Sequence, residues 1–190
     1  MKKTNFKSLL AIVALVGIIG TMPFLTSCKK STSVAPTLYD SVGGSVMVKD
    51  PKSTSGAMIE AGRLVLRSVV DSTIFVIAAD GSLNNKFFSV LLGEVGKGNL
   101  SGFTELSMNL TDFFCVATGA KSYKYTGLDM VSAHDPAKNS RMGTKASSAD
   151  FDLFVSDLVK GAQQNGVSND LIANHIGPLV YTLKSQVVQK

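Results

Sequence analysis

Apolar residues recur at helical spacing along most of the chain after residue 37. Between residues 103 and 118 they are spaced three, four, three and one apart, which places most of them on one face of a helix. Similar stripes over 147–165 and 169–187 predict two more helices. The segment 57–79 is apolar nearly all round, and although its β-branched run would permit a strand, its length favours a helix. Because strands and helices do not alternate, the pattern predicts an all-α fold.

Capping and turn residues mark the ends of these predicted helices. Gly119 is placed to end the helix over 103–118, and the helix over 147–165 is expected to begin at Ser147 or Ser148 and to end at Gly166. Pro178 lies about three turns into the last helix, which it is expected to kink or interrupt. Shorter helices are expected over 87–95 and 128–134, and irregular segments over 96–102 and 135–146.

Composition is consistent with one compact domain that follows an N-terminal segment. The sequence has 190 residues, of which 45% are hydrophobic and 17% charged, a balance that does not favour a disordered chain. Two cysteines and two histidines are too few for a disulfide scaffold or a Cys/His zinc cluster. The formal net charge is +5, but three of the lysines lie in the first seven residues. The other charges nearly balance, so the composition does not indicate a nucleic-acid partner.

The first 27 residues have the pattern of a secretory signal. Three lysines precede an apolar run over 9–19, which is too short to cross a bilayer comfortably as a mature helix. The sequence LTSC, ending at Cys28, then resembles the lipobox of bacterial lipoproteins, in which the cysteine is lipidated. An ordinary secretory signal is the alternative. We expect a signal peptide over 1–27, a lipid-anchored tether over 28–37 and one domain over 38–190.

The residues around Cys28 also suggest a location. Lys29 occupies the position at which an inner-membrane retention signal would favour Asp, so we expect an outer-membrane lipoprotein that faces the periplasm. Acyl chains partition into lipid by about 0.8 kcal/mol per buried CH₂, so several chains anchor a protein firmly. Lipidation of Cys28 would leave Cys115 unpaired, and we expect Cys115 to be a buried packing residue.

Two motifs in the domain resemble truncated haemoglobins of the group-one branch. The segment LYDSVGG at 38–44 is similar to the opening motif of that family. The segment YTGLDM at 125–130, followed by Ala133 and His134, resembles the family's YTG segment and its spacing to a histidine. The spacing from YTG to His134 is the more specific of the two motifs.

Two further segments extend the resemblance over most of the domain. Residues 151–167 are similar to the next helix of the family and its turn, with Ser168 in place of a proline. The stretch from Val69 to the pair Phe87-Phe88 resembles the first long helix and its double Phe. The resemblance implies an all-α two-over-two helical sandwich, with insertions over about 45–62 and after His134.

The resemblance places His134 at the proximal position, where a histidine ligates the iron of haem b. A neutral imidazole is a strong ligand of haem iron, and His134 follows Met130 by one helical turn, so both can face one cavity. A solvated histidine at the start of a polar loop is the alternative. The other positions that the resemblance assigns to the haem pocket are Phe88, Phe113, Phe114, Tyr125 and Met130.

The distal side of the implied pocket departs from the family. The usual distal tyrosine aligns with Ile74, or with Phe75 if the register slips by one residue, and its usual polar partners align with Leu106 and Leu110. A hydrogen bond to bound O₂ is charge-assisted and contributes about 1.5–3 kcal/mol. An apolar distal wall therefore predicts fast O₂ release, which suits gas sensing, NO chemistry or haem handling better than oxygen storage.

The insertion after His134 brings three basic residues that could pair with a haem propionate: Lys138, Arg141 and Lys145. An ordinary solvated loop is the preferred interpretation for at least two of them. The other histidine, His175, is expected to be a partly buried, hydrogen-bonded residue rather than a second iron ligand.

Three functions remain open from the sequence. The leading one is a lipid-anchored haem protein that binds a diatomic gas (O₂, NO or CO) or carries out a redox reaction of that gas, with an unidentified reductase and the membrane as partners. The second is a haem-binding or scavenging lipoprotein. The third is a structural or interaction domain without haem, in which apolar distal residues fill the cavity. No motif for nucleophilic catalysis is present.

Overall fold

The computed structural model describes residues 35–190. The predicted signal peptide, Cys28 and most of the predicted tether lie outside these residues. Within the described part of the chain, no helix is both long enough and apolar enough to span a bilayer.

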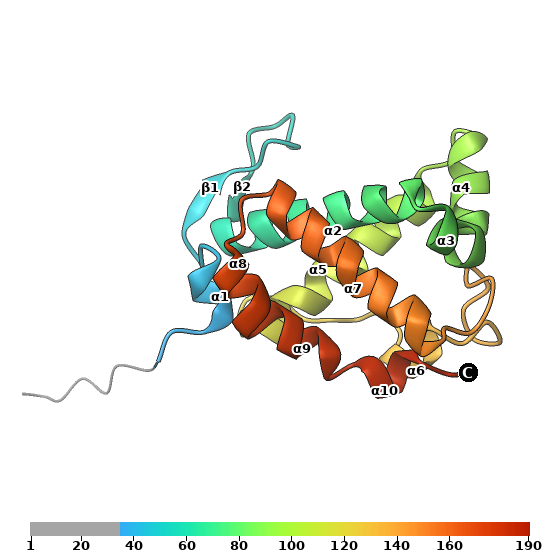
Figure 1. Cartoon of the computed structure of the whole chain (residues 1–190). Coiled ribbons are helices and arrows are strands. Elements are labelled where there is room, and N and C mark those ends of the chain that lie inside the picture. Colours follow the sequence, from blue (N-terminus) through green and yellow to red (C-terminus); the bar gives the residue numbers. More distant parts are fainter. Residues whose placement is uncertain (1–34) are drawn as a thin grey trace, which may run out of the picture. The chain divides into compact units, whose positions relative to one another are not determined.

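The described chain is a bundle of helices with one small hairpin (Figure 1). The hairpin strands are β1 (Met47–Lys49) and β2 (Met58–Glu60). The longest helices are α2 (Ala61–Ala79), α5 (Ser101–Thr118) and α7 (Ser148–Gln164). The shorter helices are α1 (Leu38–Ser41), α3 (Gly81–Leu83), α4 (Ser89–Gly96), α6 (Met130–Ala133), α8 (Asn169–Leu171), α9 (Gly177–Tyr181) and α10 (Lys184–Val187), together with the π-helical segments η1 (Asn84–Phe88) and η2 (Ile172–Ile176).

The long helices form two packed layers, as the all-α two-over-two prediction requires. Helix α2 packs against both α5 and α7, and α7 is flanked by the C-terminal run α8–α10 (Figure 1). Gly161 of α7 lies directly on Thr73 of α2, where a Cβ atom would meet the Thr73 backbone nitrogen at 2.8 Å. The absence of a side chain at Gly161 therefore allows the two helices to cross closely. The core between the layers includes Leu66, Val70, Ile74, Phe114, Phe151, Leu158, Ile176 and Val180.

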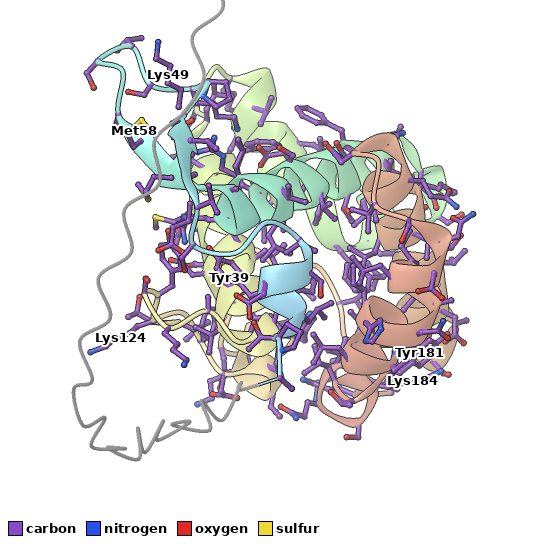
Figure 2. All side chains as sticks on the ribbon, turned by 90° about the vertical axis from the view of Figure 1, so that its left-hand side faces the viewer. Tyr39, Lys49, Met58, Lys124, Tyr181 and Lys184 are labelled. Carbon is purple, nitrogen blue, oxygen red and sulfur yellow. The ribbon has the colours of Figure 1, made fainter. Side chains whose placement is uncertain are left out.

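The insertion that follows the Gly-Gly motif is a hairpin, which corrects the predicted helix start. Residues 58–60 pair antiparallel with residues 47–49, so the helix predicted over 57–79 begins only at Ala61. Arg67 of α2 donates to both carboxylate oxygens of Asp50, at 2.9 and 2.6 Å, and so ties the hairpin to the helix. In Figure 2 the hairpin residues Lys49 and Met58 lie on the opposite side of the molecule from Tyr181 and Lys184.

The opening motif joins α1 to the start of α2. The buried Tyr39 hydroxyl donates to a carboxylate oxygen of Glu60 at 2.8 Å. A Cβ at Gly62 would meet the Tyr39 ring at 2.8 Å, so the ring requires a glycine there. Gly43 and Gly44 have φ values of 120° and 57°, a region that favours glycine, and they reverse the chain between α1 and the hairpin.

The predicted helix ends agree closely with the structure. Gly119 ends α5 with a φ of 102°, Gly166 follows α7 with a φ of 72°, and Ser147, not Ser148, caps α7. Cys115 is fully buried as expected, and burial raises the pKa of its thiol to about 11.

Pro178 changes the type of the last helix rather than breaking it. The Gly177 N–H donates to the Ile172 carbonyl, five residues back, which makes the turn before Pro178 a π-turn. A proline ring clashes with the carbonyl four residues earlier in a regular helix, and the wider turn relieves this clash. The interruption itself comes later, at residues 182–183, between α9 and α10.

The N-terminus of α7 depends on a buried carboxylate. Asp150 is 3% exposed, its carboxylate accepts from the Ser147 backbone N–H at 2.9 Å, and Lys86 of η1 donates to it at 2.6 Å. The hydrogen bonds from Lys86 and Ser147 hold the pKa of Asp150 well below its usual range. This carboxylate therefore joins α7 to η1 while it caps the helix.

We predict that Asp150→Asn lowers the free energy of unfolding by about 1–2 kcal/mol at neutral pH, because the variant loses charge-assisted hydrogen bonds. The pKa of Asp150 is lowered by folding, so its contribution is present above the unfolded carboxyl pKa of about 4 and is lost as the pH falls further. Urea unfolding at neutral and acidic pH should therefore show the gap between variant and wild type closing in acid.

The matched control is Asp152→Asn, two residues further along α7. Asp152 is half exposed and pairs with Lys184 at 2.7 Å, so its loss should change stability by less than about 1 kcal/mol. Equal losses for the two variants, or a gap that is independent of pH, would contradict the role given to Asp150.

Candidate functional site

A cavity of about 580 Å³ opens between α2, η1, α5, α6, α7 and the C-terminal run. Its walls are mainly aliphatic and aromatic, and its polar lining residues include His134 and Arg141. A mostly apolar cavity with a few convergent polar groups is the usual form of a site for a small molecule or cofactor.

All nine residues that the sequence analysis assigned to a haem pocket line this one cavity. Helix α5 supplies four of them, and the others come from α2, η1, α6 and the chain on either side of α6. These residues are Ile74, Phe88, Leu106, Leu110, Phe113, Phe114, Tyr125, Met130 and His134. The structure thus brings them together, while their role toward a cofactor remains a prediction.

Of the two residues of α2 that the sequence analysis offered for the distal position, only Ile74 lines the cavity. Ile74 is 2% exposed and lines the cavity, whereas Phe75 is 64% exposed and packs on Phe103, with ring centroids 5.4 Å apart. The Phe75 side chain therefore faces away from the cavity that Ile74 lines.

His134 is held at the end of the single-turn helix α6. The Asp129 side chain caps α6 by accepting from the Ser132 N–H at 3.0 Å. The His134 backbone N–H donates to the Val131 carbonyl at 3.3 Å. His134 thus follows directly on the one turn that carries Met130.

The imidazole of His134 is oriented by its own helix. Its Nδ1 lies 2.8 Å from the Met130 carbonyl oxygen. A carbonyl oxygen only accepts, so Nδ1 carries the proton and the neutral ring keeps its free lone pair on Nε2. Burial lowers the pKa of His134, which favours the neutral ring at neutral pH. The side chain is therefore a neutral imidazole in the cavity wall, which is the form of histidine that binds metals.

Two side chains from other parts of the chain fix α6 in place. The Asn139 amide donates to the Ala133 carbonyl at 2.9 Å, and the Gln189 amide donates to the Val131 carbonyl at 2.8 Å. The Gln189 backbone N–H also donates to the Ala146 carbonyl at 2.9 Å. Sequence reasoning missed both residues, since neither belongs to a motif and Gln189 is 58 residues from its partner Val131.

The YTG motif has a physical basis in this structure. The Tyr125 hydroxyl donates to the Leu128 carbonyl at 2.5 Å, so the ring folds back over the intervening residues. A Cβ at Gly127 would meet the Tyr125 ring and hydroxyl at 2.6 to 2.8 Å. The ring also packs edge-on against Phe113, with centroids 5.5 Å apart. Gly127 thus allows Tyr125 to reach the cavity wall beside Phe113.

The cavity lining from α2 and α5 contains the three apolar residues predicted for the distal side and two polar neighbours that the sequence analysis missed. Ile74, Leu106 and Leu110 line the cavity together with Thr73 and Asn109. The Thr73 hydroxyl already donates to the Val69 carbonyl at 2.8 Å. Asn109 follows the exposed Glu105 by one turn of α5, which places it toward the rim.

The basic residues of the insertion separate into two classes. Lys138 and Lys145 are exposed and do not line the cavity, as the solvated-loop interpretation expects. Arg141 lines the cavity and pairs with Glu94 at 3.3 Å and with Glu105 at 2.9 Å.

The prediction of a partly buried, hydrogen-bonded His175 is wrong. His175 is exposed and lies outside the cavity lining. Ile172 and Ile176 of the same π-turn are buried and take the core-facing positions, so His175 faces solvent.

We predict that Gly127→Ala destabilises the protein by about 1–3 kcal/mol, since the new methyl group overlaps the Tyr125 ring. The matched control is Gly93→Ala, because a Cβ at Gly93 in α4 meets nothing within 4 Å. The control should be neutral or stabilising by up to about 1 kcal/mol. Urea midpoints measure both effects, and a Gly127→Ala variant as stable as the control would contradict the packing described here.

Comparison with known proteins identifies the fold. No family model and no curated protein matches the sequence. Among solved structures, the chain is similar to a mutant of the truncated hemoglobin from Tetrahymena pyriformis in its Fe(III) form, with a TM-score of 0.57 and 17% sequence identity. The match covers 82% of this chain and all of that one. The two-over-two arrangement of the described residues is therefore the truncated-globin fold.

Proposed function

We propose that this protein binds haem b in the cavity and that His134 ligates the iron through Nε2. The observation that carries the proposal is the hydrogen bond between His134 Nδ1 and the Met130 carbonyl, which leaves the Nε2 lone pair free in the cavity wall. The same arrangement, a ring N–H bonded to the protein, orients histidines that ligate metals in general.

The residues present fit such a cofactor. The cavity volume of about 580 Å³ lies within the range of cofactor pockets. Phe88, Phe113 and Tyr125 provide aromatic surface from three different segments, which suits a flat apolar macrocycle. Arg141 provides a cation at the rim, where the carboxylates of a porphyrin need a partner.

The bound haem would supply an iron centre that takes up a diatomic gas such as O₂, NO or CO. His134 would hold that centre, and Ile74 of α2 with Leu106 and Leu110 of α5 would supply apolar lining of the same cavity. None of these three side chains has a hydrogen-bond donor, so they exclude water without stabilising a partly negative ligand. These three side chains therefore favour rapid exchange of O₂ over oxygen storage. A reductase that keeps the iron ferrous is the partner that this function requires.

We also propose, from the sequence alone, that the domain is anchored by lipid at Cys28 in the outer membrane and faces the periplasm. The lysines, the apolar run over 9–19 and the LTSC motif support this location. Gas binding, or the alternative of haem handling, would then take place in the cell envelope.

The first test is titration of the purified full-length chain with haemin. Wild type should develop a Soret band of a histidine-ligated haem, and His134→Ala should lose most of the affinity and the ligand signature. His175→Ala is the matched control, since it removes the other histidine, which is exposed and outside the cavity. Added imidazole should restore the spectrum of a His134→Gly variant. A wild-type chain that stays colourless with haemin would refute the proposal.

The second test introduces a distal hydrogen-bond donor. Ile74→Tyr should slow O₂ dissociation from the ferrous protein about ten- to a hundred-fold and change CO dissociation much less, because O₂ depends more on such a bond. Phe75→Tyr, one residue along, should leave both rates unchanged because that side chain is exposed. Slow O₂ release in the wild type would contradict an apolar distal wall, whatever the variants do.

A further inference from the structure

The rim of the cavity contains a charged cluster that joins three segments of the chain. Arg141 comes from the insertion after α6, Glu94 from α4 and Glu105 from α5. The Arg141 Nε donates to Glu94 at 3.3 Å, and its Nη1 donates to Glu105 at 2.9 Å. The guanidinium is thus shared between two carboxylates at the edge of the cavity that it lines.

Two features show that this cluster is built into the fold. Gly102 makes room for it, because a Cβ there would collide with the Glu94 carboxylate and lie 3.0 Å from the Arg141 Nε. The Arg141 backbone N–H donates to the Asn139 side chain at 3.1 Å, which fixes the loop at this point. Arg141 is therefore held at the rim by its backbone as well as by its ion pairs.

Two hydrogen-bonding atoms of the cluster have no partner among the described residues. Glu94 Oε2 is buried and has no hydrogen-bond partner among the described residues. Arg141 Nη2 likewise has no partner there, while a guanidinium offers five N–H donors in a fork that matches a carboxylate. The rim thus keeps an unused donor of Arg141 beside the cavity.

The charges at this edge are also unbalanced. Arg141 is the one Lys or Arg among the described residues that line the cavity, and it faces two carboxylates. Lys86, the nearby cation of η1, is committed to the buried Asp150 at 2.6 Å. The cluster carries one positive and two negative charges, so a third carboxylate bound to Arg141 would meet less repulsion if one of the glutamates moved away.

We propose, building on the haem-binding function above, that Arg141 binds a propionate carboxylate of the haem and exchanges Glu105 for it. Glu105 is the partner that leaves because its side chain is 54% exposed, whereas that of Glu94 is 24% exposed and rests on Gly102. Water readily takes over the contacts of an exposed carboxylate, while a buried one loses its partner at a cost. Glu105 is accordingly a competitor that limits how tightly the cavity holds its cofactor.

The test measures haem release from the full-length chain to an excess of a high-affinity acceptor protein, with two probes. The first probe is haemin, and the second is its dimethyl ester, which keeps the iron and the macrocycle but lacks free carboxylates. Arg141→Gln should release haemin at least about ten-fold faster than wild type and release the ester at the wild-type rate. Arg141→Lys should release haemin at a rate between those of wild type and Arg141→Gln, since lysine keeps the charge but lacks the planar fork of N–H donors.

The competing carboxylate is tested by Glu105→Gln, which should slow haemin release about three- to ten-fold and leave ester release unchanged. Lys138→Gln and Lys145→Gln are the matched controls, because both are exposed cations of the same loop that do not line the cavity. Their haemin release should equal that of wild type. Urea midpoints of all variants verify that each one is folded.

Several outcomes would overturn the inference. Equal acceleration of haemin and ester in Arg141→Gln would show loss of packing rather than of carboxylate binding. Faster or unchanged haemin release in Glu105→Gln would exclude the exchange. Absence of haemin binding by wild type would overturn the proposed function and this inference together, whereas bound haemin whose release ignores Arg141 would overturn this inference alone.

Discussion

The hydrogen bond from His134 Nδ1 to the Met130 carbonyl determines the chemistry that the cavity can support. It assigns the proton to one ring nitrogen and leaves the other as a base or ligand. The helix that provides this carbonyl has only four residues, and isolated helices of that length are not stable in water. The orientation of the ring therefore depends on tertiary contacts to α6, which Asn139 and Gln189 supply through the Ala133 and Val131 carbonyls.

The cavity itself favours a ligand-binding function over a structural domain. Apolar side chains around an empty space lose dispersion contacts, and larger residues would recover them. In α2 the large ring of Phe75 lies outside the cavity, and the smaller side chain of its neighbour Ile74 lines it. A domain that had lost its cofactor would be free to fill this space, so the retained cavity supports the proposal that it is occupied in function.

Local signals in the sequence predicted the long helices well. Ser147 and Gly119 act on their own neighbours through caps, so α5 and α7 were predicted within about two residues. The start of α2 was wrong because residues 58–60 pair with residues 47–49, a contact that local periodicity does not contain. The cavity residues were found through a resemblance, and four of them lie on α5, whose ends were predicted within about two residues. The partners of Arg141 are 47 and 36 residues away from it, so only the folded chain shows them.

The insertion after α6 gives a physical reason why a longer loop need not weaken the site. From sequence, extra residues next to His134 place the retention of a cofactor in question. In the structure, one side chain of that loop bonds both ways: the Asn139 amide donates to the Ala133 carbonyl, and its oxygen accepts from the Arg141 N–H. The segment from His134 to Arg141 is therefore braced at its middle. His134 and Arg141 thus line the same cavity from one short stretch of chain, so the proposed iron ligand and the proposed partner of a propionate are positioned by the same loop.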